Sequence, residues 1–308
     1  MTTLLAHGRG IVVAERQDGA DLRALVLGTP GLERFVSGIL LDPESFAEAM
    51  HDAAGQNGTR QNGTRHNGAR RPDGAAPARG VPVGVSATEQ ALAAEPGDPG
   101  TVLGRRLATW AAGGAALAGW TMDVEAGDPE ECTRRARLAA AWAAGCRDAG
   151  LPAVLRCRIA VPPRASLETA ETRHREAMSR VADALLRRGV DPASIVLALG
   201  PVLPGHRATD VATADDVACA TVRALRDAGL DEVGGVAVHA SRRLADLPAH
   251  LAAVQWRERR WCWGFAADLA LLAPVAATRG GRPDLARQEL RSCLEGLVTV
   301  LRASAVLG

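Results

Sequence analysis

The chain has 308 residues, of which 47% are hydrophobic, so it can bury a sizeable core. Its 36 basic and 35 acidic residues leave a formal net charge of +1, which excludes the strongly basic surface of a protein that binds nucleic acid or an anionic membrane. No apolar run approaches the roughly 18 residues of a membrane span, and the N-terminus lacks a signal-peptide pattern. We therefore expect a soluble, cytoplasmic protein.

Eight short apolar runs follow one another along the chain. They lie at residues 10–15, 36–42, 81–87, 115–124, 153–161, 194–203, 235–241 and 261–268. Near-continuous hydrophobic strands separated by helical segments indicate a parallel sheet that is covered on both faces. Eight of them favour a (β/α)8 TIM barrel that occupies the whole chain, 1–308, as a single α/β domain. The alternative, an open doubly wound sheet that binds a dinucleotide, lacks a GxGxxG motif after the first strand.

Three of the connecting segments carry clear helix signals. They span residues 128–150, 166–189 and 213–229, with acidic residues early, basic residues late and a glycine at the end. This charge order is favourable for the helix dipole. Residues 55–80 differ from all other segments, because they contain the repeat QNGTR-QNGTR-HNGAR and almost nothing apolar. We expect them to form a disordered insertion within the barrel.

Two residue types restrict the possible chemistry. The six cysteines are scattered without a CxxC pair or a metal-ligand spacing, which is typical of buried thiols in a cytosolic protein. All 36 basic residues are arginines, and the chain contains no lysine. Without a side-chain amine, the protein cannot form a lysine Schiff base with a carbonyl substrate.

The first strand and its successors show a resemblance to a known family. GRGIVVAERQ resembles the first strand of class I fructose-1,6-bisphosphate aldolases, and GILLDPESF, GVPVGVSATEQ, LAGWTMDV, AGLPAVLRCRI and LGPVLPG are similar to later strands in the same order. The resemblance covers about residues 8–280. It implies a (β/α)8 barrel whose site lies at the C-terminal ends of the strands.

The resemblance also shows which of the family's working residues have changed. The lysines of the third, fourth and sixth strands fall on Ser86, Gly119 and Leu203, of which Leu203 is the Schiff-base position. The fourth-strand arginine falls on Thr121. The two fifth-strand glutamates fall on Arg156 and Arg158, and the first-strand aspartate falls on Glu15, which alone keeps its charge. The family's phosphate-binding segments are replaced by ASRRL and ADLA. Ordinary class I aldolase chemistry is therefore excluded.

Alternation along the strands indicates which side chains face the barrel interior. If the inward positions of the family hold, Glu15, Thr121, Asp123, Arg156 and Arg158 point to the centre. Arginines buried there need carboxylate partners, for which Glu15 and Asp123 are the natural candidates. The arginines can clamp an anionic substrate, together with Ser86 and Thr121, while Glu15 or Asp123 transfers a proton.

Further candidates lie at other strands. His239, at the end of the seventh strand, is an acid/base candidate or a hydrogen-bonded structural residue. Trp120, Trp261 and Trp263 either line a pocket for a flat or hydrophobic substrate or pack between strands and helices. We expect Asp268 to cap the helix that follows it, and His206 to be a solvated loop residue.

Two functions fit these residues. The first is a repurposed enzyme, a lyase, cyclase or isomerase without an imine, in specialised metabolism. The second is a non-catalytic pseudo-aldolase that binds a ligand or a protein. We expect no cofactor, and no metal-dependent site, because the seven histidines fall mostly on helices or in the insertion. The expected partner is a small, anionic or aromatic substrate, and a homo-oligomer is compatible with the sequence.

Overall fold

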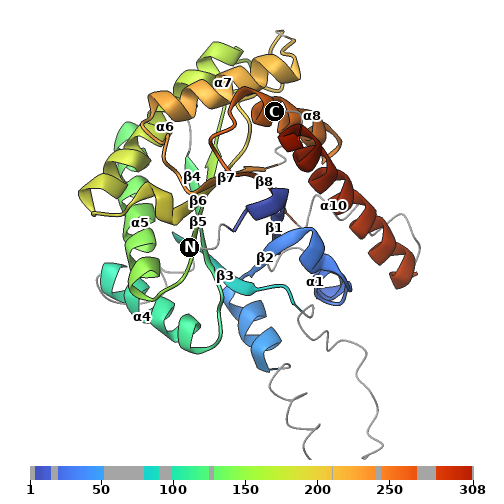
Figure 1. Cartoon of the computed structure of the whole chain (residues 1–308). Coiled ribbons are helices and arrows are strands. Elements are labelled where there is room, and N and C mark those ends of the chain that lie inside the picture. The colour runs from blue at the N-terminus through green and yellow to red at the C-terminus, as the bar shows by residue number, and fades with distance from the viewer. Residues whose placement is uncertain are drawn as a thin grey trace, which may run out of the picture.

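Eight parallel strands close into a barrel in the order in which they occur in the chain, from β1 beside β2 to β8 beside β1 (Figure 1). The strands are β1 (Gly10–Ala14), β2 (Val36–Leu41), β3 (Val83–Thr88), β4 (Ala118–Val124), β5 (Ala153–Ile159), β6 (Ile195–Leu199), β7 (Gly235–His239) and β8 (Trp263–Asp268). Each lies within one of the eight runs named above, or extends one residue beyond it, so the predicted TIM barrel is confirmed.

The computed structural model describes residues 4–14, 20–51, 80–89, 99–124, 128–209, 211–239, 244–268 and 282–306. The expected catalytic residue Glu15 lies outside these ranges, as does the insertion at 55–80 apart from Gly80. Within the described ranges, no helix is both long enough and apolar enough to cross a membrane.

Strand side chains alternate between two apolar layers. Leu155 and Cys157 of β5 belong to the large outer layer between strands and helices, whereas Val154 belongs to the small layer inside the barrel. Leu5 fills the N-terminal end of the barrel, where it approaches Gly235 and Gly264. Because this end is filled by apolar side chains, the polar inward residues are confined to the C-terminal ends of the strands.

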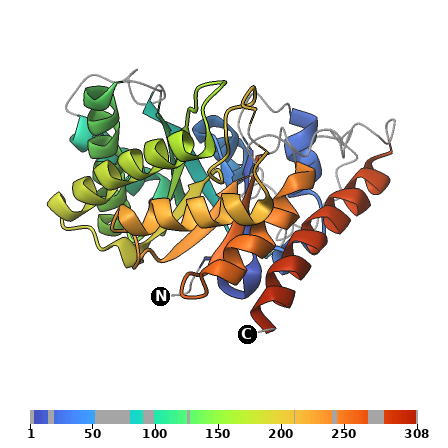
Figure 2. The same ribbon diagram turned by 90° about the horizontal axis from the view of Figure 1, so that it is seen from above.

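The helices form an outer layer around the strands (Figures 1 and 2). They are α1 (Ala20–Leu27), α4 (Pro99–Ala112), α5 (Pro129–Asp148), α6 (Leu167–Arg187), α7 (Ala214–Asp227), α8 (Leu247–Arg257) and α10 (Pro283–Val306), with 3-10 turns η1 (Ala6–Gly8), η3 (Leu32–Arg34), η4 (Pro192–Ser194) and η5 (Leu244–Asp246). The C-terminal helix α10 packs against α8 and η1.

The three helices predicted from sequence begin where their caps predict. The side chains of Asp128, Ser166 and Thr213 accept backbone N–H groups of the first turns of α5, α6 and α7, and thereby satisfy donors that have no partner within the helix. Each helix is followed by a glycine with positive φ, namely Gly150 (69°), Gly189 (63°) and Gly229 (76°). Side chains rarely adopt this conformation, so the glycines terminate the helices.

Candidate active site

A buried polar network crosses the barrel interior between β5 and β8. Arg156 of β5 forms an ion pair through Nη2 with Oδ1 of Asp268, the last residue of β8. Its Nη1 donates a hydrogen bond to Thr121 Oγ1 of β4 at 3.2 Å. His239, the last residue of β7, lies 2.7 Å from the second oxygen of Asp268, measured from Nε2 to Oδ2. One carboxylate therefore holds both a guanidinium and an imidazole.

Because Arg156 is buried, the network depends on the negative charge of the Asp268 carboxylate. The Arg156 side chain is 2% exposed, and a charge so far from water is stable only with a partner. Burial by itself would raise the pKa of Asp268, but the hydrogen bond from His239 and the positive charge of Arg156 outweigh it, and the pKa lies below its ordinary value. Asp268 is therefore ionised at neutral pH.

The second inward arginine lies nearer to solvent. Arg158 forms a two-pronged ion pair with Asp123 of β4, from Nε to Oδ1 at 2.6 Å and from Nη2 to Oδ2 at 3.0 Å. Both side chains are more than 40% exposed. A pair of this kind contributes little to stability, so its guanidinium can exchange Asp123 for an anionic ligand at low cost.

Beside these residues lies a cavity of about 520 Å³ at the C-terminal ends of β4 to β7. Charged and titratable groups in its wall include Asp123, Arg158, His174, His206 and His239. Leu203 also lines it, so the position that the resemblance gives to the Schiff-base lysine faces the same space as His239. His206 is exposed, as expected of a loop residue, and still contributes to this wall.

The environment of His239 suits a proton-transfer group. A carboxylate can only accept a hydrogen bond, so Nε2 carries the proton that bonds to Asp268. In the neutral ring Nδ1 then has a lone pair and can accept a proton. The contact with Asp268 fixes the orientation of the ring, as an orienting carboxylate does in other acid/base sites.

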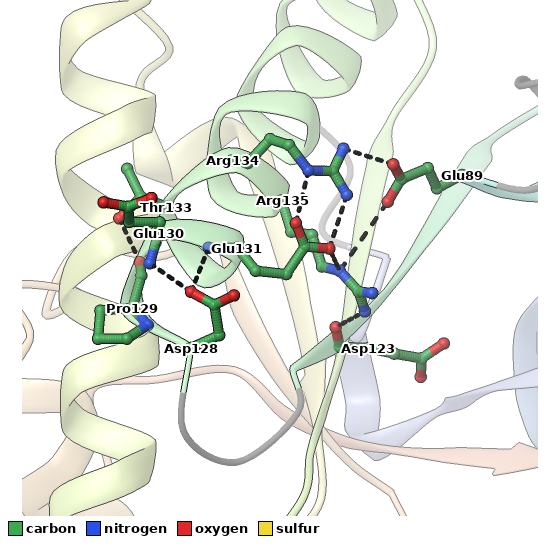
Figure 3. Close-up of polar contacts among 9 residues, drawn as sticks. All are labelled: Glu89, Asp123, Asp128, Pro129, Glu130, Glu131, Thr133, Arg134 and Arg135. Atoms are coloured by element: carbon green, nitrogen blue, oxygen red, sulfur yellow. Dashed lines mark hydrogen bonds and ion pairs between the residues drawn. The ribbon is translucent and has the colours of Figure 1, made fainter.

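A second polar cluster fixes the edge of the site at the N-terminus of α5 (Figure 3). Glu131 accepts hydrogen bonds from Nε of Arg134 and Nε of Arg135, both at 2.6 Å, and these bonds lower the pKa of Glu131 to about 2. Arg134 also pairs with Glu89 just after β3, and Arg135 donates to the backbone oxygen of Asp123. The cluster thus connects α5 to the ends of β3 and β4, and holds the backbone of Asp123.

The structure brings some of the expected site residues together and separates others. Asp123, Arg158 and His239 line the cavity, whereas Arg156 and Thr121 belong to the buried network and are not among its lining residues. Ser86 is buried on β3, on the face opposite Val85 and Ala87 of the outer layer. No described contact connects Ser86 to the cavity.

The three tryptophans are not in the cavity wall. Trp120 lies in the outer layer, where its ring is 5.3 Å from that of Trp142 in α5. Trp261 and Trp263 precede and begin β8, at the opposite end of the barrel from the cavity. Their ring nitrogens donate to backbone oxygens of Asp231 and Glu258. For Trp261 and Trp263 this placement supports packing, because strand β8 ends, rather than starts, at the site. Trp120 also lines a second cavity of about 230 Å³, together with Thr121 and Asp123, so for this residue both expectations stay open.

Sequence reasoning missed the role of Asp268. Its two carboxylate oxygens pair with Arg156 and His239. The expectation that it caps the next helix stays a prediction, because residues 269–281 lie outside the described ranges. A signal was present, because Asp268 is the last residue of its strand and has the same parity as the inward Ala266. The expected pairing of Arg156 with Glu15 cannot be followed, because Glu15 lies outside the described residues.

Comparisons with known proteins agree with this fold. The family model described as fructose-bisphosphate aldolase class-I matches residues 11–296. A solved fructose-bisphosphate aldolase from Plasmodium falciparum, in a ternary complex with TRAP and a small-molecule inhibitor, has a TM-score of 0.77 and 19% identity, over 98% of this chain and 92% of that chain. The comparison with curated proteins finds no match. The chain belongs to the class I fructose-bisphosphate aldolase family.

Proposed function

We propose that this protein is an enzyme that performs acid/base chemistry on a small anionic substrate without a Schiff base, as a lyase, cyclase or isomerase. One observation carries the proposal: His239, whose Nε2 lies 2.7 Å from Oδ2 of Asp268, lines an open cavity of about 520 Å³. The absence of lysine from the sequence supports the loss of imine chemistry, and Leu203 at the family's Schiff-base position leaves an apolar wall there.

In the proposed reaction His239 transfers the proton. Its Nδ1 takes a proton from a carbon beside a carbonyl group of the substrate. The C–H electron pair forms a carbon–carbon double bond, and the carbonyl π electrons move to oxygen. Asp268 keeps the ring oriented, and Arg156 keeps Asp268 ionised. A positioned general base of this kind accelerates proton transfer by about 10²–10⁴-fold.

Arg158 is the proposed anchor for an anionic group of the substrate. Its guanidinium faces the cavity and is half exposed, so a carboxylate or phosphate can replace Asp123 as its partner. Asp123, once released, is a second candidate for proton transfer. Glu15 is a third, and its place in the site stays a prediction from the sequence. The replacement of the family's phosphate-binding segments argues against a sugar bisphosphate substrate and is compatible with specialised metabolism.

The alternative is a non-catalytic pseudo-aldolase that binds a ligand or a protein. One observation favours it: Arg156 and Arg158 already have carboxylate partners within the protein, so the network can serve to fill the former site. A network that only fills the former site needs no open cavity beside it. It also needs no imidazole on Oδ2 of Asp268, the carboxylate oxygen that does not pair with Arg156. We therefore prefer the enzyme.

Proton exchange tests the proposal without knowledge of the natural substrate. The protein is incubated in D2O with a panel of 2-oxo acids, hydroxy acids and ketose phosphates, and deuterium incorporation is followed by NMR. We expect deuterium exchange into at least one compound, and we expect the exchange rate to fall about 100-fold in the His239→Asn variant. Sodium borohydride should trap no covalent adduct. Exchange that does not depend on His239 refutes the role of this residue, whereas no exchange in the whole panel together with ligand binding supports the pseudo-aldolase instead.

A further inference from the structure

We propose that His174 of α6 is a second proton-transfer group of the same cavity, which acts on the substrate from the helix side while His239 acts from the barrel. The inference rests on the proposed function and extends it to a site with two histidines. It also narrows the substrate class to small anions with an acidic C–H bond beside a carbonyl group.

The hydrogen bond of His174 fixes which ring nitrogen is protonated. Nδ1 lies 2.8 Å from the backbone oxygen of Ala170, one helical turn earlier. A carbonyl oxygen can only accept, so Nδ1 must be the donor. In the neutral ring Nε2 is therefore the acceptor, with a lone pair that can take a proton. The helix in this way holds the ring in one tautomer and one orientation.

Burial keeps this ring neutral and thus ready to act as a base. His174 is 4% exposed, although it lines the cavity together with Arg158 and His239. Loss of hydration lowers the pKa of His174, because the charged form is disfavoured, and the bond to Ala170 only partly offsets this. His239 differs in its partner, because its Nε2 contacts the carboxylate of Asp268 instead of a backbone oxygen. The two rings therefore line the same cavity with different partners, a backbone oxygen for His174 and a carboxylate for His239.

The resulting step is an enolisation that balances in atoms and charge. In this two-histidine form of the reaction the base changes: Nε2 of His174, instead of Nδ1 of His239, removes the proton from the carbon beside the carbonyl group. The C–H electron pair forms the carbon–carbon double bond, and His239 enters the step protonated. The carbonyl π electrons move to oxygen, which receives the Nδ1 proton of the His239 imidazolium. His174 ends protonated and His239 neutral, so no oxidant or reductant is needed. Return of a proton at the neighbouring carbon completes an isomerisation, whereas loss of a leaving group completes an elimination.

Chemical modification tests whether the lone pair of His174 is open to the cavity. Diethylpyrocarbonate reacts with unprotonated imidazole nitrogens, and peptide mass spectrometry locates the modified residues in the full chain. We expect His174 to react at a rate within about tenfold of His51, which is exposed, even though His174 is almost fully buried. Reaction of His174 only after unfolding in urea would show a lone pair enclosed in the core and would overturn the inference.

Deuterium exchange then tests the role itself, with the panel compound that wild type exchanges fastest. His174→Asn should lose at least about 100-fold in rate while it keeps its affinity for that compound. Imidazoles added to His174→Ala should restore exchange in the order of their basicity, which a purely structural role does not predict. The matched control is His250→Asn in α8, another histidine whose pKa burial lowers, and its rate should stay within about threefold of wild type.

The two proposals fail in different ways. If His239→Asn abolishes exchange and His174→Asn does not, the enzyme stands and the role of His174 is refuted. If wild type exchanges no compound, the proposed function fails and this inference fails with it. If His174→Asn lowers both affinity and folding stability in step with the rate, the histidine is a structural residue and the inference is wrong.

Discussion

Replacement of Asp268 by asparagine is the most informative single change, because it removes one charge and keeps the shape. Arg156 would then be a guanidinium, 2% exposed, that faces a neutral amide. Removing one partner of a buried ion pair costs about 3–5 kcal/mol, since the other charge is left without compensation. The Asp268 side chain is 22% exposed and the amide oxygen can still accept a hydrogen bond. We therefore expect a loss of about 3 kcal/mol, at the lower end of that range.

The matched control is Asp123→Asn at the outer pair. Arg158 and Asp123 are 42% and 46% exposed, so water replaces the lost charge, and the expected cost is about 0–1 kcal/mol. Urea unfolding followed by tryptophan fluorescence at neutral pH compares the free energies of unfolding of both variants. If Asp268→Asn costs no more than Asp123→Asn, then Asp268 does not compensate Arg156, and the buried network described here is refuted.

The pH dependence gives an independent check with a defined sign. The folded protein lowers the pKa of Asp268, so the contribution of this carboxylate to stability is complete above the unfolded value of about 3.9. It is lost as the pH falls through the lower, folded value. The stability advantage of wild type over Asp268→Asn should therefore be constant from neutral pH down to about pH 5 and shrink below about pH 4. If the stability difference between wild type and Asp268→Asn grows as the pH falls, the lowered pKa of Asp268 is contradicted.

Three further results are expected. NMR titration should place the pKa of Glu131 near 2, and Arg135→Gln should raise it, whereas an unchanged pKa contradicts the cluster at α5. Trp263→Ala should cost about 3–5 kcal/mol of stability in urea unfolding and leave anion binding at the cavity intact, because its ring lies at the other end of the barrel. Leu203→Lys places an amine in the cavity wall, so borohydride should trap dihydroxyacetone phosphate on this variant and not on wild type; an adduct on wild type refutes the loss of imine chemistry.

The fold could be predicted from sequence because each of its signals is local. Strands buried on both faces read as continuous apolar runs, and the caps at Asp128, Ser166 and Thr213 mark the helix starts in the sequence itself. Parity along β4 and β5 likewise places Thr121, Asp123, Arg156 and Arg158 inside the barrel. The same parity should have placed Trp120 outside, since it neighbours Thr121 on the strand.

The partners within the site could not be predicted in the same way. Arg158 pairs with its neighbour across the β4–β5 ladder, where residues 123 and 158 are in register. Arg156 instead reaches across the barrel to β8, a choice that depends on side-chain length and barrel width rather than on sequence spacing. His174 shows a different limit: a helical position does not tell whether the ring faces the core or a cavity.

Stability alone does not require the buried ion pair of Arg156 and Asp268. Apolar residues of similar volume often replace such a pair without loss, or with a gain of about 1–4 kcal/mol. The double variant Arg156→Met/Asp268→Leu should therefore be at least as stable in urea as wild type, in contrast to Asp268→Asn. It leaves His239 without its carboxylate, so proton exchange should fall by about 100-fold while the barrel persists. If this stable variant exchanges protons as fast as wild type, the network only fills the barrel, and the pseudo-aldolase is the better account of the protein.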